Sequence, residues 1–564
     1  MTRAPRTLLA LLLLSGCPPA EVSKPDTEPT PDDSATEPLV DGDGDGSPGG
    51  EDCDDADPTV YPGAEEACNE RDDDCDGAVD EDLPVYTFFS DGDEDGYGVP
   101  EPTMEACGEV PGWAARADDC DDLDPDVHPE ARDRPHDGVD ADCDGSDPCA
   151  EADHRWYKGN LRFYLRDDPA EVMTEFCKSY DANEGGLSME GDSYTDLEAF
   201  SCIVCISDYL DIEAPRLRSA DGLDNLVWVG GNLGFPVSSL RDISALSSLR
   251  GVDGTLFIWD TDLVELSPLA NLASLGALDL DALRVQDLSM FTWVQELDYL
   301  YIFTNDVPDL TGFSGLRSVR DLGLGSAGPM SIEGLGGLTH AEELTLTALP
   351  GVTDATVLAG AGPIATLFIS TDGLHTLDGL NMAPVGEKLT VDNTTSLESL
   401  RGIEALEIGG QMNVYSNEDL TSLQGFDGLV ETYTLLVNSN PKLRDLTGLG
   451  ALEVASTLWV YDNDTLTSLS GAGSLREVDN FAVYGNPSLE SVDGLEGLRI
   501  VNGSLSITSN EVLESVQALH GLEWVQDLTI VGNPNLSTAE TDALLDAIGL
   551  ENIYGELDVR DNGR

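Results

Sequence analysis

The sequence predicts a mainly β protein: a long parallel β-solenoid preceded by disulfide-linked, loop-rich acidic repeats. Apolar residues recur every 22 to 24 residues from about residue 185 to the end of the 564-residue chain, and a fixed period of this length is typical of a solenoid. Aspartates recur in short glycine-containing loops between residues 41 and 147. All cysteines after Cys17 lie between Cys53 and Cys205, so we expect cross-links to stabilise the first third and packing to stabilise the rest.

The composition limits the classes of partner. The formal net charge is −82 and the pI is about 4.1. Nucleic-acid binding is excluded, because contact with phosphates requires a basic surface. Divalent cations are the natural counter-charge. Of the 11 cysteines, ten remain without Cys17, an even number as a disulfide framework requires.

The N-terminus predicts export. Arg3 and Arg6 precede a leucine-rich core at residues 8–14 that is too short to span a bilayer. Gly16 stands directly before Cys17, and the segment resembles a bacterial lipoprotein signal. That resemblance implies cleavage before Cys17 and its acylation, and each buried methylene of such an anchor contributes about 0.8 kcal/mol. The alternative is an ordinary secretory signal with an incidental cysteine.

We therefore expect residues 1–16 to be a signal peptide. Residues 17–40 should contain the lipidated cysteine and a disordered stalk, because Pro, Thr, Asp, Glu and Ser dominate and no core can form. Pro18 follows the cysteine in place of the Asp that retains lipoproteins in the inner membrane. The same resemblance thus implies an extracytoplasmic, lipid-anchored protein at the outer membrane or surface of a bacterium.

Residues 41–147 contain 38 acidic residues against four Arg and no Lys. Carboxylates at loop positions 1, 3 and 5, followed by Gly at position 6, fold around a hard cation, and oxygen ligands suit Ca²⁺. Asp52 falls at position 12 of the first loop and Asp80 at position 9 of the second. The alternative is an acidic disordered region that only solvates the chain. Four segments have the pattern: Asp41, Asp43 and Asp45; Asp72, Asp74 and Asp76; Asp91, Asp93 and Asp95; Asp140, Asp142 and Asp144.

The region forms two aligned units. An Asp-Cys-Asp-Asp segment begins at Asp52 in one unit and at Asp119 in the other, and each unit ends in Asp-Cys-Asp-Gly. Over residues 41–147 this arrangement resembles the metal-binding repeat of the MopE type, which is named after a bacterial surface copper-binding family. Copper prefers imidazole and soft sulfur ligands, whereas these loops offer carboxylates and cysteines that we expect to be paired. We therefore predict several Ca²⁺ ions rather than copper.

Residues 148–184 are expected to form a cysteine-containing connector or cap. Cys202 and Cys205 form a CxxC pair, which is either a redox site or part of two disulfides that staple the cap together with Cys177. No thioredoxin-like βαβ pattern surrounds the pair, so we expect disulfides, whose connectivity the sequence does not determine.

The repeats of residues 185–564 contain Leu-x-Ile or Leu-x-Val strands followed by a leucine-rich segment, in about seventeen rungs. Each rung buries its apolar face only by stacking on its neighbours. The pattern resembles the receptor L-domain, which implies a right-handed leucine-rich-repeat-like parallel β-solenoid. Residues 538–548 predict a capping helix. Asparagines in register are either simple turn formers or a buried ladder that bonds adjacent turns, and we expect the ladder: Asn417, Asn440, Asn463, Asn486, Asn510 and Asn533.

Because the strand Leu and Ile point inward, the intervening residues point outward. Large aromatic side chains exposed on a sheet are typical of a binding surface, although they can also simply stabilise the sheet by stacking across rungs. We predict a face that binds a protein or polysaccharide ligand, formed by Phe257, Trp259, Tyr301, Phe303, Tyr415, Trp459, Tyr461 and Tyr484.

No catalytic motif stands out. His340, His375 and His520 are isolated in different rungs, and we expect the protein not to be an enzyme. The sequence favours a cell-surface lipoprotein in which a calcium-binding acidic spacer presents a solenoid for binding or adhesion. The alternatives are a protein that sequesters calcium or copper, with the solenoid as scaffold, and an undetected hydrolase.

Overall fold

The computed structural model describes residues 41–48, 50–129, 131, 139–143, 145, 149, 154–164, 169–192, 194–236, 238–304 and 306–563. The predictions for the signal peptide, for Cys17 and its stalk, and for Asp144 lie outside these residues. The chain divides into two compact units, up to residue 117 and from residue 118 onward, and each is described by itself. In the part of the chain that the structure describes, no helix has the length and apolarity needed to cross a membrane.

The first unit is mostly loops, as predicted. Its one small sheet pairs β1 (Tyr86–Ser90) with β2 (Tyr97–Ala106) in antiparallel register, and β3 (Trp113–Ala114) and β4 (Arg116–Ala117) flank that pair. Only short runs here alternate apolar and polar residues, so the core is small. Two disulfides tie the loops together: Cys53–Cys75 and Cys68–Cys107.

The second unit begins with three further disulfides, and the ten cysteines after Cys17 are therefore all paired. Cys177, at the end of helix α1 (Pro169–Cys177), bonds Cys202, and Cys149 bonds Cys205. The two cysteines of the CxxC pair thus belong to different cross-links, which agrees with the cap interpretation and not with a redox pair. The third disulfide, Cys120–Cys143, lies in the acidic repeat.

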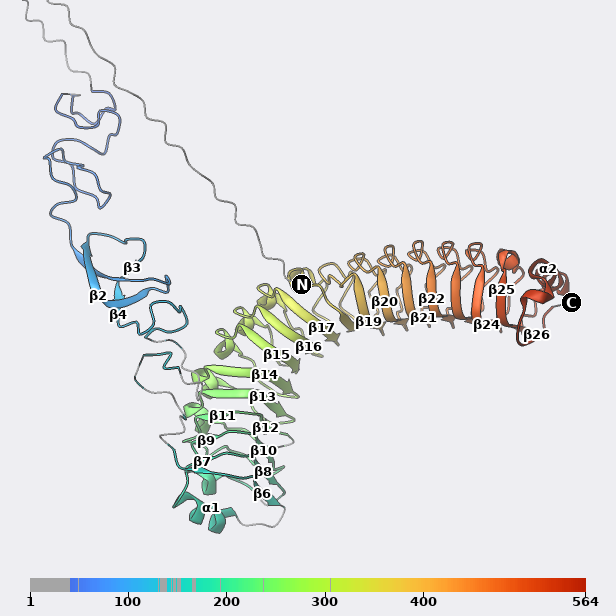
Figure 1. Ribbon diagram of the computed structural model, residues 1–564, viewed down its shortest axis with the longest axis horizontal. Coiled ribbons are helices and arrows are strands. Elements are labelled where there is room, and N and C mark those ends of the chain that lie inside the picture. The colour runs from blue at the N-terminus through green and yellow to red at the C-terminus, as the bar shows by residue number, and fades with distance from the viewer. Residues whose placement is uncertain are drawn as a thin grey trace, which may run out of the picture. The chain divides into compact units, whose positions relative to one another are not determined.

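The solenoid is one parallel sheet whose strands follow chain order in Figure 1. Its strands are β5 (Trp156–Tyr157), β6 (Leu161–Tyr164), β7 (Ala182–Asn183), β8 (Leu187–Glu190), β9 (Cys205–Ile206), β10 (Leu210–Glu213), β11 (Trp228–Val229), β12 (Leu233–Phe235), β13 (Gly251–Trp259), β14 (Ser274–Asp281), β15 (Glu296–Phe303), β16 (Ser318–Gly325), β17 (His340–Thr347), β18 (Thr366–Ser370), β19 (Val385–Asp392), β20 (Ile408–Tyr415), β21 (Glu431–Asn438), β22 (Val454–Tyr461), β23 (Glu477–Tyr484), β24 (Ile500–Thr508), β25 (Trp524–Val531) and β26 (Leu557–Arg560).

Short 3₁₀ helices return the chain in many rungs, and one α-helix lies before the last strand. Ser537 caps this helix by accepting the Glu540 N–H at 3.2 Å, and the predicted helix over 538–548 is confirmed. The helices are η1 (Glu198–Phe200), η2 (Ser244–Ser248), η3 (Ser267–Asn271), η4 (Ser289–Phe291), η5 (Thr311–Phe313), η6 (Glu333–Leu335), η7 (Thr356–Leu358), η8 (Gln517–Gly521), α2 (Thr538–Ile548) and η9 (Leu550–Asn552).

The solenoid begins earlier than the predicted boundary at residue 185. Four initial rungs each contain two short strands, from β5 and β6 to β11 and β12, and the two columns merge in β13. With one rung for each later strand, the stack has about 18 turns. The first rungs escaped prediction because Leu161 and Phe163 replace the usual Leu-x-Ile pair, while pairing in register with Leu187 and Met189.

The ladder prediction is confirmed in the C-terminal rungs. Asn463 is fully buried; its backbone N–H donates to Asn486 Oδ1 at 3.0 Å and its amide Nδ2 donates to the Val437 carbonyl at 3.0 Å. The same pattern repeats from Asn417 onward and continues to Asn562, which accepts the Asn533 N–H at 3.1 Å. A buried amide that satisfies a donor and an acceptor in neighbouring turns fixes the rung-to-rung register.

Candidate metal loops and binding face

The four aspartate loops share one backbone conformation. Loop positions 4 and 6 have positive φ in each of them, a region that glycine enters freely and other residues only at a cost. The pairs are Gly44 and Gly46 (91° and 106°), Cys75 and Gly77 (60° and 97°), Glu94 and Gly96 (67° and 95°), and Cys143 and Gly145 (57° and 95°). The turn is therefore the same in both acidic repeats, although the residue at position 4 is Gly, Cys or Glu.

Backbone amides hold the first carboxylate of each loop. The N–H at position 6 donates to the aspartate at position 1, at distances of 3.2 Å for Asp41, 2.9 Å for Asp72, 3.1 Å for Asp91 and 2.8 Å for Asp140. The N–H at position 7 donates to the aspartate at position 5 in the first three loops, at 2.7–2.8 Å. These bonds orient the carboxylates before any ligand arrives.

The first loop gathers the predicted ligands. One carboxylate oxygen from each of Asp41, Asp43 and Asp45 lies within 4.8 Å of the others. Buried oxygens of Asp43, Asp45 and Asp52 have no hydrogen-bond partner among the described residues, a costly state for a carboxylate. Burial raises the pKa of Asp43, and repulsion from Asp45, Asp52 and Asp41 adds to the effect despite a backbone hydrogen bond. A bound divalent cation would partner the buried oxygens and reduce the repulsion between the carboxylates.

The other loops resemble the first in part. In the third loop, Asp95 also has a buried oxygen with no partner among the described residues, and Asp91 is buried. In the fourth loop, Asp140 and Asp142 are described, and Asp140 accepts the Gly145 amide as its counterparts do.

The second loop recruits a glutamate that the sequence pattern did not reveal. Glu66, Asp72 and Asp74 place ligand oxygens within 4.8 Å of one another. Glu66 lies upstream of the loop and accepts the Asp73 N–H at 2.9 Å and the Asp80 N–H at 2.9 Å. The sequence did not reveal Glu66 because the spacing rule that we applied counts only residues downstream of the first aspartate. The chain upstream of the loop folds back and brings Glu66 to it.

Glu81 also lies against this loop. A backbone hydrogen bond lowers the pKa of its carboxyl group. Burial and the charges of Asp76, Glu66 and Asp74 outweigh that bond, so the net shift of the pKa is upward. One Glu81 oxygen is buried without a partner among the described residues. The predicted ligand, Asp80, instead accepts the backbone N–H groups of residues 69 and 70 at 2.9 and 3.1 Å. Glu81 thus joins the carboxylates of this loop, while backbone amides engage the carboxylate of Asp80.

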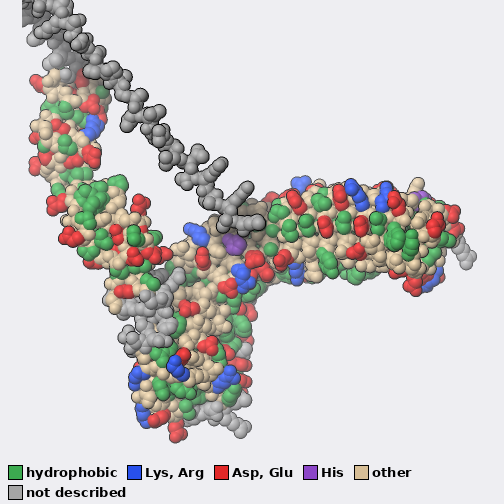
Figure 2. Space-filling model, viewed as in Figure 1, with side chains coloured by type: hydrophobic (Ala, Val, Ile, Leu, Met, Phe, Trp, Pro, Cys, Tyr) green, Lys and Arg blue, Asp and Glu red, His purple; other side chains and the backbone are tan. Residues whose placement is uncertain are grey.

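Sulfur is not available as a soft ligand in these loops. The cysteine sulfurs nearest the carboxylates, those of Cys53, Cys75, Cys68 and Cys107, are held in disulfides. The donor set is therefore carboxylate oxygen, which hard cations prefer. Figure 2 shows Asp and Glu side chains spread widely over the viewed surface, with few Lys or Arg.

The predicted binding face occupies two stretches of the sheet. In the C-terminal stretch the rings of Tyr461 and Tyr484 stack with centroids 4.6 Å apart and planes 7° apart. Trp459 is 40% exposed beside them. Tyr415 lies two strands away across Asn438; burial raises its pKa, as does a hydrogen bond with Asp392.

In the N-terminal stretch the register places Phe257 and Trp259 of β13 two strands from Tyr301 and Phe303 of β15. Ring centroids are 5.1 Å apart in the first pair and 6.2 Å apart in the second. The sequence did not single out Tyr299, whose ring lies 5.0 Å from that of Tyr301. Asp298 and Tyr299 are both outside the core between the buried Leu297 and Leu300, which a strict alternation rule misses.

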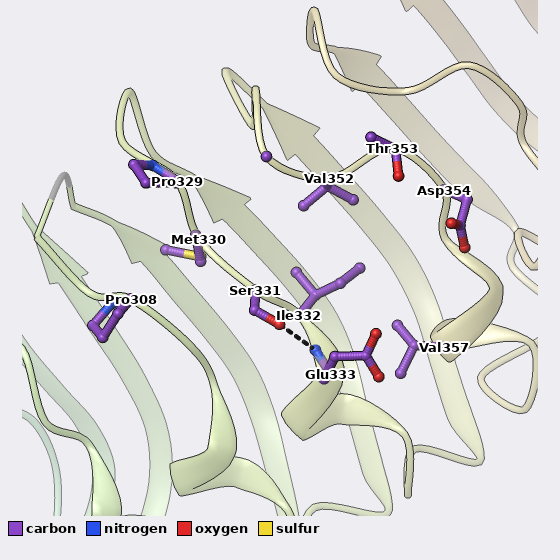
Figure 3. A pocket seen from close by; sticks show the side chains of 11 residues that line it. Pro308, Pro329, Met330, Ser331, Ile332, Glu333, Val352, Thr353, Asp354 and Val357 are labelled. Atoms are coloured by element: carbon purple, nitrogen blue, oxygen red, sulfur yellow. Dashed lines mark hydrogen bonds between the residues drawn. The ribbon is translucent and has the colours of Figure 1, made fainter.

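A separate hollow of about 300 Å³ lies beside the loops that follow β15 to β17 (Figure 3). Pro308, Met330 and Val357 supply part of its apolar wall, and Glu333 and Asp354 its charges. Asp354 is engaged by Thr356, whose hydrogen bonds lower its pKa. None of the eleven lining residues is His, Cys, Lys or Arg, and we see no catalytic grouping in this hollow.

A family model described as "Putative metal-binding motif", of the MopE copper-binding type, matches residues 52–81 and 119–147. The chain carries two MopE-type metal-binding motifs followed by a leucine-rich-repeat-like β-solenoid. The matched residues include the second and fourth aspartate loops together with Glu66 and Glu81. The first and third loops lie almost entirely outside the matched segments.

Two solved structures are similar. An internalin from Listeria monocytogenes is 18% identical, with a TM-score of 0.36, over 56% of this chain and 92% of that protein. A leucine-rich-repeat protein from Leptospira interrogans is 12% identical, with a TM-score of 0.31, over 65% of this chain and 88% of that protein. No curated protein matches the sequence.

Proposed function

We propose that this chain is a lipid-anchored bacterial surface protein in which calcium-loaded acidic loops form a spacer for a ligand-binding solenoid. The observation that carries the proposal is a set of buried carboxylate oxygens that have no hydrogen-bond partner among the described residues, those of Asp43, Asp45, Asp52, Glu81 and Asp95. They lie in loops with one repeated backbone conformation. Such oxygens need a cation, and a donor set made only of oxygen suits Ca²⁺.

The location rests on sequence. Acylation of Cys17 anchors the chain, the stalk up to residue 40 gives it reach, and five disulfides suit an oxidising compartment. The aromatic face of the solenoid supplies the binding surface. Binding of a protein or polysaccharide there, without catalysis, is the role that the exposed rings support.

Sequestration of copper is the competing function, because the family model carries copper in its name. The paired cysteines argue against it, since they remove the soft donors that copper favours. Sequestration of calcium would use the same loops, and would leave the aromatic face without a ligand.

The test measures bound metal and shape on the full chain with Cys17→Ser, by elemental analysis, calorimetry and small-angle scattering, with and without chelator. We expect several Ca²⁺ ions per chain and expansion on chelation. The triple variant Asp43→Asn, Asp45→Asn, Asp52→Asn should lose one Ca²⁺, whereas the matched variant Glu105→Gln, on an exposed residue of β2, should lose none. Stoichiometric copper would favour sequestration, and a chain that takes up no metal would contradict both functions.

A further inference from the structure

Strand β14 presents two carboxylates between two aromatic strands of the binding face. The register sets Asp279 between Phe257 and Tyr301, and Asp281 between Trp259 and Phe303. Adjacent parallel strands lie about 4.8 Å apart, so β13 and β15 lie roughly 10 Å apart, with the two aspartates on the strand between them. We call this arrangement the β14 trough.

Glycines on the neighbouring strands show which way the rings lean. A Cβ added at Gly234 of β12 would overlap the Phe257 ring. Likewise, a Cβ added at Gly323 or Gly325 of β16 would overlap Tyr301 or Phe303. These three rings therefore lie over β12 and β16, away from β14, and they leave the space above the two aspartates open.

Trp259 differs from the other three rings. Its side chain lies close enough to Asp279 to lower the pKa of that carboxyl group, and it remains 37% exposed. It therefore forms a side wall of the trough, with its indole available for stacking.

The trough has negative charge without a counter-charge. Burial raises the pKa of Asp279, although the nearby side chain of Trp259 opposes the shift. Among the described residues, no ion pair reaches Asp279 or Asp281. Arg320 of β16 is already paired with Asp298 at 2.8 Å, and Arg241 with Asp262 at 2.6 Å. The charge of Arg284, which follows β14, acts on Asp262.

We propose that the β14 trough binds an arginine side chain from a basic segment of a partner protein. A planar guanidinium can bond carboxylates in a bidentate manner and stack on an aromatic face at the same time. The trough offers both groups: Asp279 and Asp281 as acceptors, and Trp259 as the aromatic face. The strongly acidic chain attracts basic partners over a distance.

Charge also selects against a polysaccharide at this place. An anionic polysaccharide is repelled by the uncompensated aspartates. A neutral sugar can stack on the rings, but it leaves the two negative charges unneutralised. The inference rests on the binding role proposed above for the sheet face, and it names the class of partner for the N-terminal stretch of that face.

The test uses the calcium-loaded full chain with Cys17→Ser, and two labelled twelve-residue peptides. One peptide alternates Gly with Arg, and in the other citrulline replaces Arg, which keeps the shape but removes the charge. Fluorescence anisotropy should show the arginine peptide binding at least tenfold more tightly. The double variant Asp279→Asn, Asp281→Asn should weaken it by about tenfold or more, and Trp259→Ala should weaken it severalfold.

The matched control is Glu342→Gln with Glu343→Gln, which removes two exposed charges from β17 of the same sheet. It should leave the affinity within about twofold, and circular dichroism with thermal melting verifies that all variants fold. Equal losses in both double variants would overturn the proposal, because only general charge attraction would remain. Equal binding of the citrulline peptide would also overturn it.

Cellohexaose serves as a neutral glycan probe. If it binds this stretch and keeps its affinity in Asp279→Asn, Asp281→Asn while the arginine peptide does not bind, the arginine assignment fails and the binding role of the face stands. If neither probe binds, the arginine assignment fails, and so does the binding role of this stretch, while calcium loading is judged separately by calorimetry.

Discussion

The acidic loops of the first unit and the C-terminal rungs of the solenoid achieve order by opposite means. Residues 41–117 bury only a few apolar side chains, among them Val60 and Phe88, and two disulfides cross-link their loops. From β20 to β25, each strand buries its inward-facing residues almost completely, and no cysteine is present there. Where the chain cannot form a core, it depends on cross-links and on the cations that we propose; where it can, packing is sufficient.

The largest predicted effect is the unfolding of the acidic loops under conditions that leave the C-terminal rungs folded. Reductant together with chelator should unfold residues 41–117, because loss of a native disulfide from a small unit costs about 2–5 kcal/mol and the carboxylates then repel one another. The rungs from β20 to β26 should stay protected. Hydrogen exchange read by mass spectrometry measures both regions in one sample, and comparable loss of protection in the rungs would contradict the comparison.

A cavity in the solenoid should lower the stability of the rungs and leave the acidic loops unaffected. Leu458 of β22 is fully buried, so Leu458→Ala should cost about 2–5 kcal/mol. We expect denaturant unfolding of the solenoid to shift, while calcium binding by the loops is unchanged. The exposed neighbour Trp459, changed to Ala, is the control and should shift unfolding far less. A cavity variant as stable as the original chain would show that packing does not hold these rungs.

The asparagine ladder sharpens the comparison within the solenoid. Asn463→Ala removes the acceptor of the Asn440 N–H and the donor to the Val437 carbonyl, and buried groups left unpaired cost about 1–3 kcal/mol. The N-terminal rungs have hydroxyl side chains at comparable places; Thr304 donates to the Leu283 carbonyl at 2.6 Å. Thr304→Ala should cost less, about 1 kcal/mol, as measured by denaturant midpoints. An equal cost would mean that the ladder adds nothing beyond single hydrogen bonds.

The same contrast explains how much the sequence could predict. The strands and the ladder follow from strict periods, the capping helix follows from the amphipathic segment where the repeat breaks, and local spacing set the turn of the aspartate loops. Glu66 and Glu81 could not be found in this way, because their approach to Asp74 depends on how residues outside the loop fold back. Asp279 and Asp281 were missed for a different reason: they stand at ordinary outward positions, and their setting appears only when register places aromatic strands on either side.

The smallest predicted effect concerns one of the few basic residues of the acidic loops. Hydrogen bonds from Arg71 and Thr59 lower the pKa of Asp57 to about 2. Because this pKa is below that of the unfolded chain, roughly 3.9, the pair stabilises the loops above about pH 4, and the contribution is lost as the pH falls toward 2. Arg71→Gln should return the pKa of Asp57 most of the way to its ordinary value, which an NMR titration of the carboxyl resonance detects. Both partners are partly exposed to solvent, so solvent screening should keep the change in loop stability near the limit of measurement. A large loss of stability at neutral pH in this variant would mean that ion pairs, rather than disulfides and cations, hold the first unit together.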